Sequence, residues 1–394
     1  MPPLAIVAAL ASTSVYYRGC ARTVVESGAN RYVFFIDSNT DLVYAKSTDR
    51  GRTFATPVVI HAGTYEKFAV WSDKWTPGDS GTTVHIWGIE SGIHDVNYFS
   101  LDVSTDTLGN GGAPIVVLAG TSVVTTSGNM EISGAKSRGG NLYVAFDIDG
   151  GTETGFYRST DAGATWAART DCNEATSDFY LLFPGNDADN QDMYLVYWDR
   201  SADEISLKVH DDSANSWGET SIATGMADVA TNAVQPQFSG AVRLSDGHLL
   251  IAAWNSRDVG TADLLTWDIN GAASITAKAN IITNIDDCQC VNLALGPTET
   301  VHATYIGKSD GTETVSTAVK IYRKSSIDGM ATWGAEYGVY TDKLIESPWL
   351  AGPVRCETVW PYTVFLADAF VPSADMILGA WLPVSPHPQA AIGI

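Results

Sequence analysis

Positive charge is scarce in this chain of 394 residues. It has 23 lysine and arginine residues against 45 aspartate and glutamate residues, for a formal net charge of −22. Such a surface repels phosphate groups and anionic lipid headgroups, so we expect no nucleic acid among its partners. No apolar run approaches the ~18 residues of a membrane-spanning helix, so we expect no membrane insertion either.

Cysteine is also scarce, and its number is odd. The chain has five cysteines, which imply no disulfide framework, and the Cys-Gln-Cys at 288–290 lacks the spacing of a zinc site. We interpret them as small, buried apolar residues. The apolar start of the chain has no lysine or arginine ahead of it, so no signal peptide is recognised and a strand is predicted there.

What the chain has in quantity is short apolar runs separated by turn residues. Seven such runs begin 51 to 61 residues apart, and each is followed, after a short polar loop, by a second strand-like run. A hairpin is therefore repeated seven times. The seven first runs begin at Tyr32, Val84, Leu142, Met193, His248, Val301 and Tyr362.

Several repeats add an apolar strand on each side of the hairpin, and four antiparallel strands are the blade of a β-propeller. We predict that residues 1–394 are all-β and form a single propeller of four-stranded antiparallel blades. Seven blades are favoured, and six is the alternative if the least regular repeat, 346–383, is an accessory piece. Because this repeat stops after its third strand, the N-terminal strand 4–10 is expected to close the ring as its outer strand. Residues 384–394 are a short proline-containing tail.

A turn motif recurs after the third strand of the repeats, with the pattern Ser-x-Asp-x-Gly-x-Thr-aromatic. Its carboxylate and hydroxyls can accept hydrogen bonds from turn amides, and its glycine can take a positive φ. Segment 326–333 keeps the spacing with its glycine one place early, and segment 210–217 keeps only Asp and Trp. The motif residues are Ser47, Asp49, Gly51, Thr53, Phe54, Ser159, Asp161, Gly163, Thr165, Trp166, Asp328 and Trp333.

Copies of this motif at one point of a repeating unit make the chain similar to the sialidase-like propellers with Asp-box (BNR) repeats, over essentially its whole length. Segment 96–108 also resembles propeller proteins of tailed bacteriophages. In the sialidase-like family the Asp box is a folding motif on the face away from the active site. The resemblance therefore implies the fold and leaves the activity open.

The resemblance allows the catalytic residues of sialidases to be sought by position. Sialidases bind the sugar carboxylate with three arginines and use a tyrosine nucleophile, an assisting glutamate and an acid/base aspartate. Arg18 matches the first arginine, and Arg257 and Arg355 are the candidates for the others. Asp37 lies near the place of the aspartate, with Asp41 as the second choice.

This catalytic set is incomplete. Gln235 stands where the family has a glutamate, and a glutamine cannot act as a general base. Another glycosidase mechanism would need a second carboxylate near Asp37, and Glu26 and Glu357 are the candidates. Sequence does not give the separation of the carboxyl groups on which that mechanism depends.

Two further groups of residues suggest binding sites. Asp187, Asp189 and Asp192 alternate in a loop that could bind Ca²⁺, although it lacks the glycine and distal glutamate of an EF-hand, and no cofactor is required. A solvated loop is the other interpretation. Trp71, Trp75 and Trp87 are candidates for a glycan platform, since aromatic rings stack on sugars, and packing between blades is the alternative.

We favour a non-catalytic propeller that acts as a structural or glycan-binding module. Its expected partners are carbohydrate or other virion or surface proteins, and its expected location is a virion or the extracellular space. The alternative is a divergent, sialidase-like glycoside hydrolase that acts on surface glycans.

Overall fold

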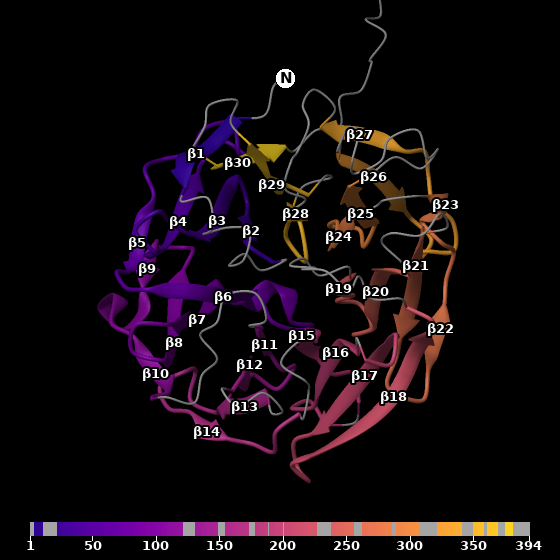
Figure 1. Cartoon of the computed structure of the whole chain (residues 1–394), viewed down its shortest axis with the longest axis horizontal. Helices are drawn as coiled ribbons and strands as arrows, with labels where there is room; N and C mark the ends of the chain where they lie inside the picture. Colours follow the sequence, from indigo (N-terminus) through magenta and orange to yellow (C-terminus); the bar gives the residue numbers. More distant parts are fainter. Residues whose placement is uncertain are drawn as a thin grey trace, which may run out of the picture.

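Strands make up almost all the regular structure in the computed structural model. The described residues are 4–10, 22–120, 131–148, 154–172, 178–187, 189–199, 201–226, 238–255, 262–285, 289–306, 321–340, 350–357, 361–368 and 375–380. No helix in these segments is long and apolar enough to cross a membrane. Strand pairing groups the strands into seven antiparallel sheets, which we number 1 to 7 (Figure 1).

The strand bounds follow the repeats of the sequence. Sheet 1 contains β2 (Val24–Ser27), β3 (Asn30–Ile36), β4 (Leu42–Ser47) and β5 (Val58–His61). Sheet 2 contains β6 (Tyr65–Ser72), β7 (Thr83–Glu90), β8 (Asp95–Asp102), β9 (Thr107–Leu108) and β10 (Ile115–Leu118), with two short 3-10 helices, η1 (Asp73–Trp75) and η2 (Gly109–Gly112), in its connections. Sheet 3 contains β11 (Ile132–Lys136), β12 (Leu142–Asp147), β13 (Thr154–Ser159) and β14 (Ala167–Ala168).

The second half of the chain continues in the same way. Sheet 4 contains β15 (Phe179–Pro184), β16 (Met193–Asp199), β17 (Glu204–Asp211) and β18 (Ser216–Thr224). Sheet 5 contains β19 (Phe238–Val242), β20 (Leu249–Trp254), β21 (Ala262–Ile269), β22 (Ile275–Ala277) and β23 (Ile282–Ile285). Sheet 6 contains β24 (Gln289–Leu295), β25 (Val301–Ile306), β26 (Ile321–Ser326) and β27 (Tyr337–Tyr340). Sheet 7 contains β28 (Leu350–Ala351), β29 (Thr363–Asp368), β30 (Asp375–Ala380) and β1 (Leu4–Leu10).

The first strand of each sheet lies toward the centre of a ring and the last lies at its rim (Figure 1). The second strands are sandwiched between neighbouring sheets, and every residue of β12, β20 and β25 is buried. The fourth strands β14 and β18 are largely exposed. This burial explains why the second strands read as unbroken apolar runs. The prediction of an all-β propeller with four-stranded antiparallel blades is confirmed.

The two ends of the chain meet in sheet 7. Strand β1 pairs antiparallel with β30, from Leu4 opposite Gly379 to Leu10 opposite Asp375. The N-terminal strand therefore supplies the outer strand of the last sheet, as predicted. Repeat 346–383, the irregular one that left the blade count open between seven and six, contributes β28, β29 and β30 to this sheet.

The buried carboxylate of Glu26 connects sheet 1 to sheet 7. Glu26 accepts hydrogen bonds from the backbone N–H groups of Tyr362 (2.9 Å) and Glu357 (3.0 Å), both in the connection between β28 and β29. Its carboxylate also lies 3.1 Å from the Arg31 guanidinium, and both side chains are almost fully buried. Burial raises the pKa of Glu26, while Arg31 and the two amides act in the opposite direction.

The Ser-Asp-Thr turn motif forms the same set of bonds at three places. In the first copy, Asp49 accepts the backbone N–H (2.8 Å) and the hydroxyl (2.7 Å) of Thr53, and Ser47 Oγ accepts the N–H of Gly51 (2.8 Å). The bonds from Thr53 lower the pKa of Asp49 to about 2. The equivalent bonds recur around Asp161 and Asp328.

Two consecutive residues of each turn have positive φ. They are Arg50 and Gly51 in the first copy, with φ of 64° and 84°. In the third copy Gly329 takes the first of these positions and Met330 the second, with φ of 66° and 68°. The displaced glycine in the sequence therefore moves from one left-handed position to the other and leaves the turn intact.

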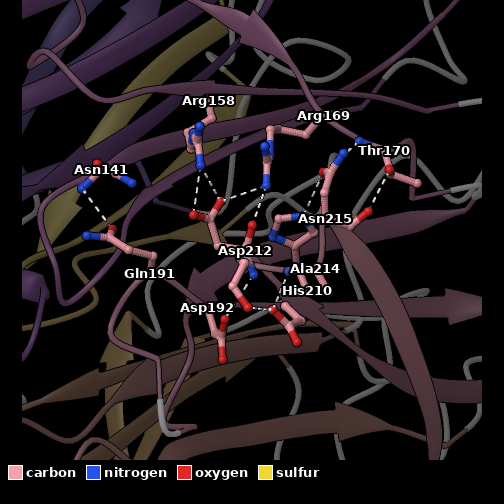
Figure 2. Close-up of polar contacts among 12 residues, drawn as sticks. Asn141, Arg158, Arg169, Thr170, Gln191, Asp192, His210, Asp212, Ala214 and Asn215 are labelled. Atoms are coloured by element: carbon pink, nitrogen blue, oxygen red, sulfur yellow. Dashed lines mark hydrogen bonds and ion pairs between the residues drawn. The ribbon is translucent and has the colours of Figure 1, made fainter.

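The fourth copy, 210–217, does not form this turn. The Asp212 carboxylate accepts two hydrogen bonds from Arg158 (2.8 and 2.7 Å) and lies 3.2 Å from Arg169, both in sheet 3 (Figure 2). Asp211 holds the local turn instead, by accepting the N–H of Ala214 (2.8 Å). The aspartate of this degraded copy thus fixes sheet 4 to sheet 3.

The contact between sheets 1 and 7 yields a stability prediction. In Glu26→Gln, one of the two backbone donors would face an amide NH₂ group, and the buried Arg31 would lose its counter-charge. We therefore expect the free energy of unfolding to fall by about 3–5 kcal/mol. Urea unfolding at pH 7 measures it. Glu219→Gln is the control, because that half-exposed glutamate on β18 should contribute less than about 1 kcal/mol. Equal losses in the two variants would show that Glu26 does not hold the ring closed.

Candidate functional site

Strand direction gives the ring two distinct ends. First strands begin and second strands end at one of them, which we call the upper end. The connections from first to second strands lie at the opposite, lower end. Each candidate residue can therefore be placed at one end from its position along a strand.

The two aspartates of the first repeat hold backbone turns at the upper end. Asp37 Oδ1, after β3, accepts the N–H groups of Asn39 (2.8 Å) and Asp41 (3.0 Å). Asp41 Oδ1 in turn accepts the N–H of Gly63 (3.0 Å). Each carboxylate thus serves its local turn, a common role of aspartate in loops.

The proposed pairing of Asp37 with Glu26 or Glu357 is wrong. Glu26, near the end of β2, lies at the lower end, opposite to Asp37. Glu357 is at that end too, where its Oε2 accepts the N–H of Gly28 (2.6 Å) and its Oε1 lies 2.5 Å from Lys74 Nζ. Both acids join neighbouring sheets, and neither faces Asp37 across a site.

Of the three candidate arginines, the structure describes Arg355 alone. Arg355 lies in the connection after β28 and forms a bridge with Leu295, at the lower end of β24, so it is remote from Asp37. Arg18, Arg257 and Gln235 lie outside the described residues, and their roles stay predictions.

A different arginine, Arg22, occupies the centre of the ring. Its Nη1 donates to the carbonyl of Leu182 in sheet 4 (2.8 Å). Its guanidinium lies over Phe183, 4.1 Å from the ring centroid, and 5.2 Å from that of Trp71. The side chain therefore reaches from sheet 1 across to sheets 2 and 4 and fills the channel between them.

The three tryptophans do not form a glycan platform. Trp71, Trp75 and Trp87 are 0, 2 and 0% exposed. Trp71 donates to Thr76 Oγ1 (2.9 Å) and meets Trp75 edge to face. Trp87 packs on Gly134 of sheet 3, where any Cβ would lie 2.3 Å from the indole. The alternative interpretation, packing between blades, is the correct one.

Two of the three aspartates proposed for calcium accept backbone hydrogen bonds. Asp189 Oδ1 accepts the N–H of Gln191 (2.9 Å), and Asp192 Oδ1 accepts that of Asp212 (3.0 Å; Figure 2). Burial raises the pKa of Asp192, with further contributions from neighbouring acids. Among the described residues, no group of three or more His, Cys, Asp or Glu side chains is arranged to hold a metal ion.

The upper end carries a cluster of ionisable groups that the sequence did not single out. Lys67, on β6, lies 2.7 Å from Glu131, which directly precedes β11. Asp147, at the end of β12, accepts the backbone N–H of Glu131 (2.8 Å) and the hydroxyl of Tyr180 on β15 (2.9 Å). The Tyr180 hydroxyl is also 3.0 Å from the Glu131 carbonyl. These four residues, the upper cluster, join sheets 2, 3 and 4.

The electrostatics of the upper cluster favour protonated carboxyl groups. Burial raises the pKa of Glu131, and Lys67 offsets part of this effect. Burial, followed by the charge of Glu131, raises the pKa of Asp147 well above its usual value. Two buried carboxyl groups beside one ammonium disfavour full ionisation of both.

A second polar group lies at the upper end between sheets 1 and 2. The Tyr65 hydroxyl is 2.9 Å from His61 Nδ1, and Asn97 Nδ2 donates to Glu90 Oε2 (2.9 Å). Asn97 Nδ2 is also 3.4 Å from the Tyr65 hydroxyl. Tyr65 and Asn97 are buried, with 0 and 1% exposure, so His61 is the more accessible member of this second group.

Comparison with solved structures shows the fold. The chain is similar to an ulvan lyase of polysaccharide lyase family 25, with a TM-score of 0.55 and 10% identity over 97% of this chain and 96% of that one. It also matches the sialidase of Trypanosoma rangeli, with a TM-score of 0.48 and 9% identity over 96% of this chain and 58% of that one. No protein-family model matches the chain, and no curated protein sequence does. Nothing in these matches supports the resemblance to phage proteins.

The upper cluster generates a prediction about pH. A folded-state pKa of Asp147 above the unfolded value means that its protonated form stabilises the fold, and that this stabilisation is lost as the pH rises through the folded pKa. An asparagine at this position would not titrate. The free energy of unfolding of the wild type relative to Asp147→Asn should therefore fall between pH 5 and 8, as measured by urea unfolding.

Asp49→Asn is the control for this measurement. The pKa of Asp49 is lowered to about 2, so the residue is ionised in both the folded and the unfolded state from pH 5 to 8. The difference in the free energy of unfolding between the wild type and Asp49→Asn should therefore stay constant over this range. A constant difference for Asp147→Asn as well would contradict the raised pKa.

Proposed function

We propose that this chain is a non-catalytic glycan-binding propeller that receives carbohydrate at its upper end. One observation carries the proposal: the described acids offered for catalysis are committed to backbone contacts, both the candidates for the sialidase aspartate and Glu26, the candidate for another glycosidase mechanism. Asp37 and Asp41 each hold a turn through Oδ1, and Glu26 holds two amides at the lower end. A carboxylate with these partners is fixed in place by the fold.

Two features support carbohydrate as the ligand. The ulvan lyase with a similar fold is described as bound to a glucuronate–rhamnose sulfate saccharide, so a propeller of this kind can bind a sugar chain. At the upper end, the partly exposed side chains of Glu131 and His61 also offer a carboxyl and an imidazole group, which can form hydrogen bonds with sugar hydroxyls. The proposal includes a location on a virion or outside the cell, where such glycans occur.

The rigid closed ring suits a binding module. The polar contacts that join adjacent sheets fix the inner strands relative to one another, so groups at their starts are held before a ligand arrives. The central channel is filled at the level of Arg22, so a ligand at the upper end would rest on a closed floor.

A second candidate function is acid/base catalysis on a glycan by the upper cluster. The observation that favours it is the raised pKa of both Glu131 and Asp147. A protonated carboxyl beside an ionised one is the arrangement by which glycosidases donate a proton to a leaving oxygen. The Glu131 side chain is 14% exposed, so it is the member of the cluster that a substrate can reach.

A glycan array combined with a panel of chromogenic glycosides tests the proposal. We expect binding of at least one glycan class and no turnover, with binding weakened about tenfold in Glu131→Gln through the lost charge-assisted hydrogen bond. Asp37→Asn is the matched control and should bind as the wild type does. Unchanged melting temperatures show that the variants fold.

Three outcomes would contradict the proposal of a non-catalytic, glycan-binding propeller. Turnover that is lost in Asp37→Asn would contradict the non-catalytic proposal and favour sialidase-like hydrolysis. Turnover that is lost in Glu131→Gln would favour the second candidate. Failure of the wild type to bind any glycan would overturn both.

A further inference from the structure

A cavity of about 330 Å³, largely open to solvent, lies at the lower end of the ring. This volume is at the small end of the range for small-molecule sites. All of its lining residues belong to connections between first and second strands, in sheets 2, 3, 4 and 5. The lining includes Pro77, Arg138, Asn186, Asn190, Leu244 and Gly247.

The cavity lies across the axis of the ring. Pro77 belongs to sheet 2 and Leu244 to sheet 5, which are separated by sheets 3 and 4, so both can line one cavity only near the centre. The channel above is filled by Arg22 with Trp71 and Phe183, which lie near the lower ends of β6 and β15. The cavity is therefore a separate site, closed off from the upper end.

Its walls are held by hydrogen bonds between sheets 3 and 4. Arg138 donates from Nε to the carbonyl of Gly185 (2.7 Å) and from Nη2 to that of Asp187 (2.6 Å). The N–H of Gly139 donates to the carbonyl of Asn190 (2.7 Å). The Arg138 guanidinium and the backbone of Asn190 are thus fixed before any ligand binds.

The wall between sheets 4 and 5 is also held by hydrogen bonds and close packing. Asn186 Nδ2 donates to the Asp246 carbonyl (3.0 Å) and to Asn270 Oδ1 (2.7 Å). Gly247, with φ of 77°, lies so close that a Cβ would be 2.3 Å from Asn186 Oδ1. Only glycine fits this close approach without strain. The Asp246 carboxylate is paired with Arg243 at 2.6 Å.

Two polar side chains at this cavity face solvent, since Asn190 is exposed and Arg138 is partly exposed. Within the described part of the chain, neither the Asn190 side-chain amide nor Arg138 Nη1 has a hydrogen-bond partner. An amide offers two donors and an acceptor, and a guanidinium nitrogen offers further donors, which together match adjacent hydroxyls on a sugar ring. Pro77 and Leu244 supply apolar surface for the C–H face of that ring.

We propose that this cavity is a second saccharide site, specific for an uncharged sugar residue. The absence of charge follows from the whole chain. In the lining, Asp246 is paired with Arg243, whereas the Arg138 guanidinium stays positively charged, since hydrogen bonds to carbonyls do not neutralise it. The net charge of −22 repels acidic glycans. The site does not depend on the proposed function of the upper end.

Titration with maltotriose, cellotriose, mannotriose and triacetylchitotriose, followed by ligand-observed NMR, tests this site. We expect the wild type to bind at least one of them. Asn190→Trp should weaken that binding at least about tenfold, because the indole would fill the cavity. Asn190→Ala, which removes only the amide and perturbs folding least, should weaken it severalfold.

Two control variants separate this site from the upper end. Ser221→Trp places the same new side chain on the outer strand β18 and should bind as the wild type does. Glu131→Gln should leave this binding unchanged even if it abolishes binding at the upper end. The proposal is overturned if none of the four sugars binds, if binding survives in the double variant Asn190→Trp, Glu131→Gln, or if only charged saccharides bind.

Discussion

The pairing of β1 with β30 is the constraint on which the rest of the structure depends. A propeller sheet cannot bury both of its faces alone, so each of the seven sheets needs a neighbour on either side, and the first and last sheets obtain theirs only in a closed ring. One sheet built from both ends of the chain provides that closure. The two ends of the channel, and the sites proposed there, exist only in the closed form.

Neighbouring sheets are joined by one recurring device, a buried acid that accepts hydrogen bonds from the adjacent sheet. Glu26 joins sheets 1 and 7, Asp147 joins sheets 3 and 4 through Tyr180, and Asp212 joins the same two sheets through Arg158. A buried carboxylate is costly unless it is paired, so these contacts also select a single arrangement of the sheets. The raised pKa values of the upper cluster follow from the same burial. The capacity of the upper end for acid–base chemistry therefore follows from the contacts that hold the ring together.

Local sequence patterns were sufficient to predict the repeated strands, the closing strand and three of the four turn motifs. Strand period and turn chemistry act within a few residues, so they can be read from neighbouring positions. The fourth motif failed because Arg158 and Arg169 of another sheet recruit Asp212. The tryptophan prediction failed similarly, because Trp87 packs on Gly134 of the next sheet.

The candidate site was harder to predict than the fold because its members come from different repeats. Lys67, Glu131 and Tyr180 meet only when three sheets are assembled, and the sequence marks them only as polar residues at the starts of apolar strands. Arg22 gave an equally weak signal. Arg22 was not among the candidate arginines, and its contact with sheet 4 forms only in the closed ring.

A disulfide across the closure tests the central claim most directly. Ala8 and Met376 are opposite each other in the β1–β30 register, so the double variant Ala8→Cys, Met376→Cys should form an intramolecular disulfide on mild oxidation, found as a linked peptide by mass spectrometry. The oxidised protein should unfold at a higher temperature than the reduced one, because the bond restricts the unfolded chain. Failure to cross-link in a folded double variant would show that the ring is not closed by this strand.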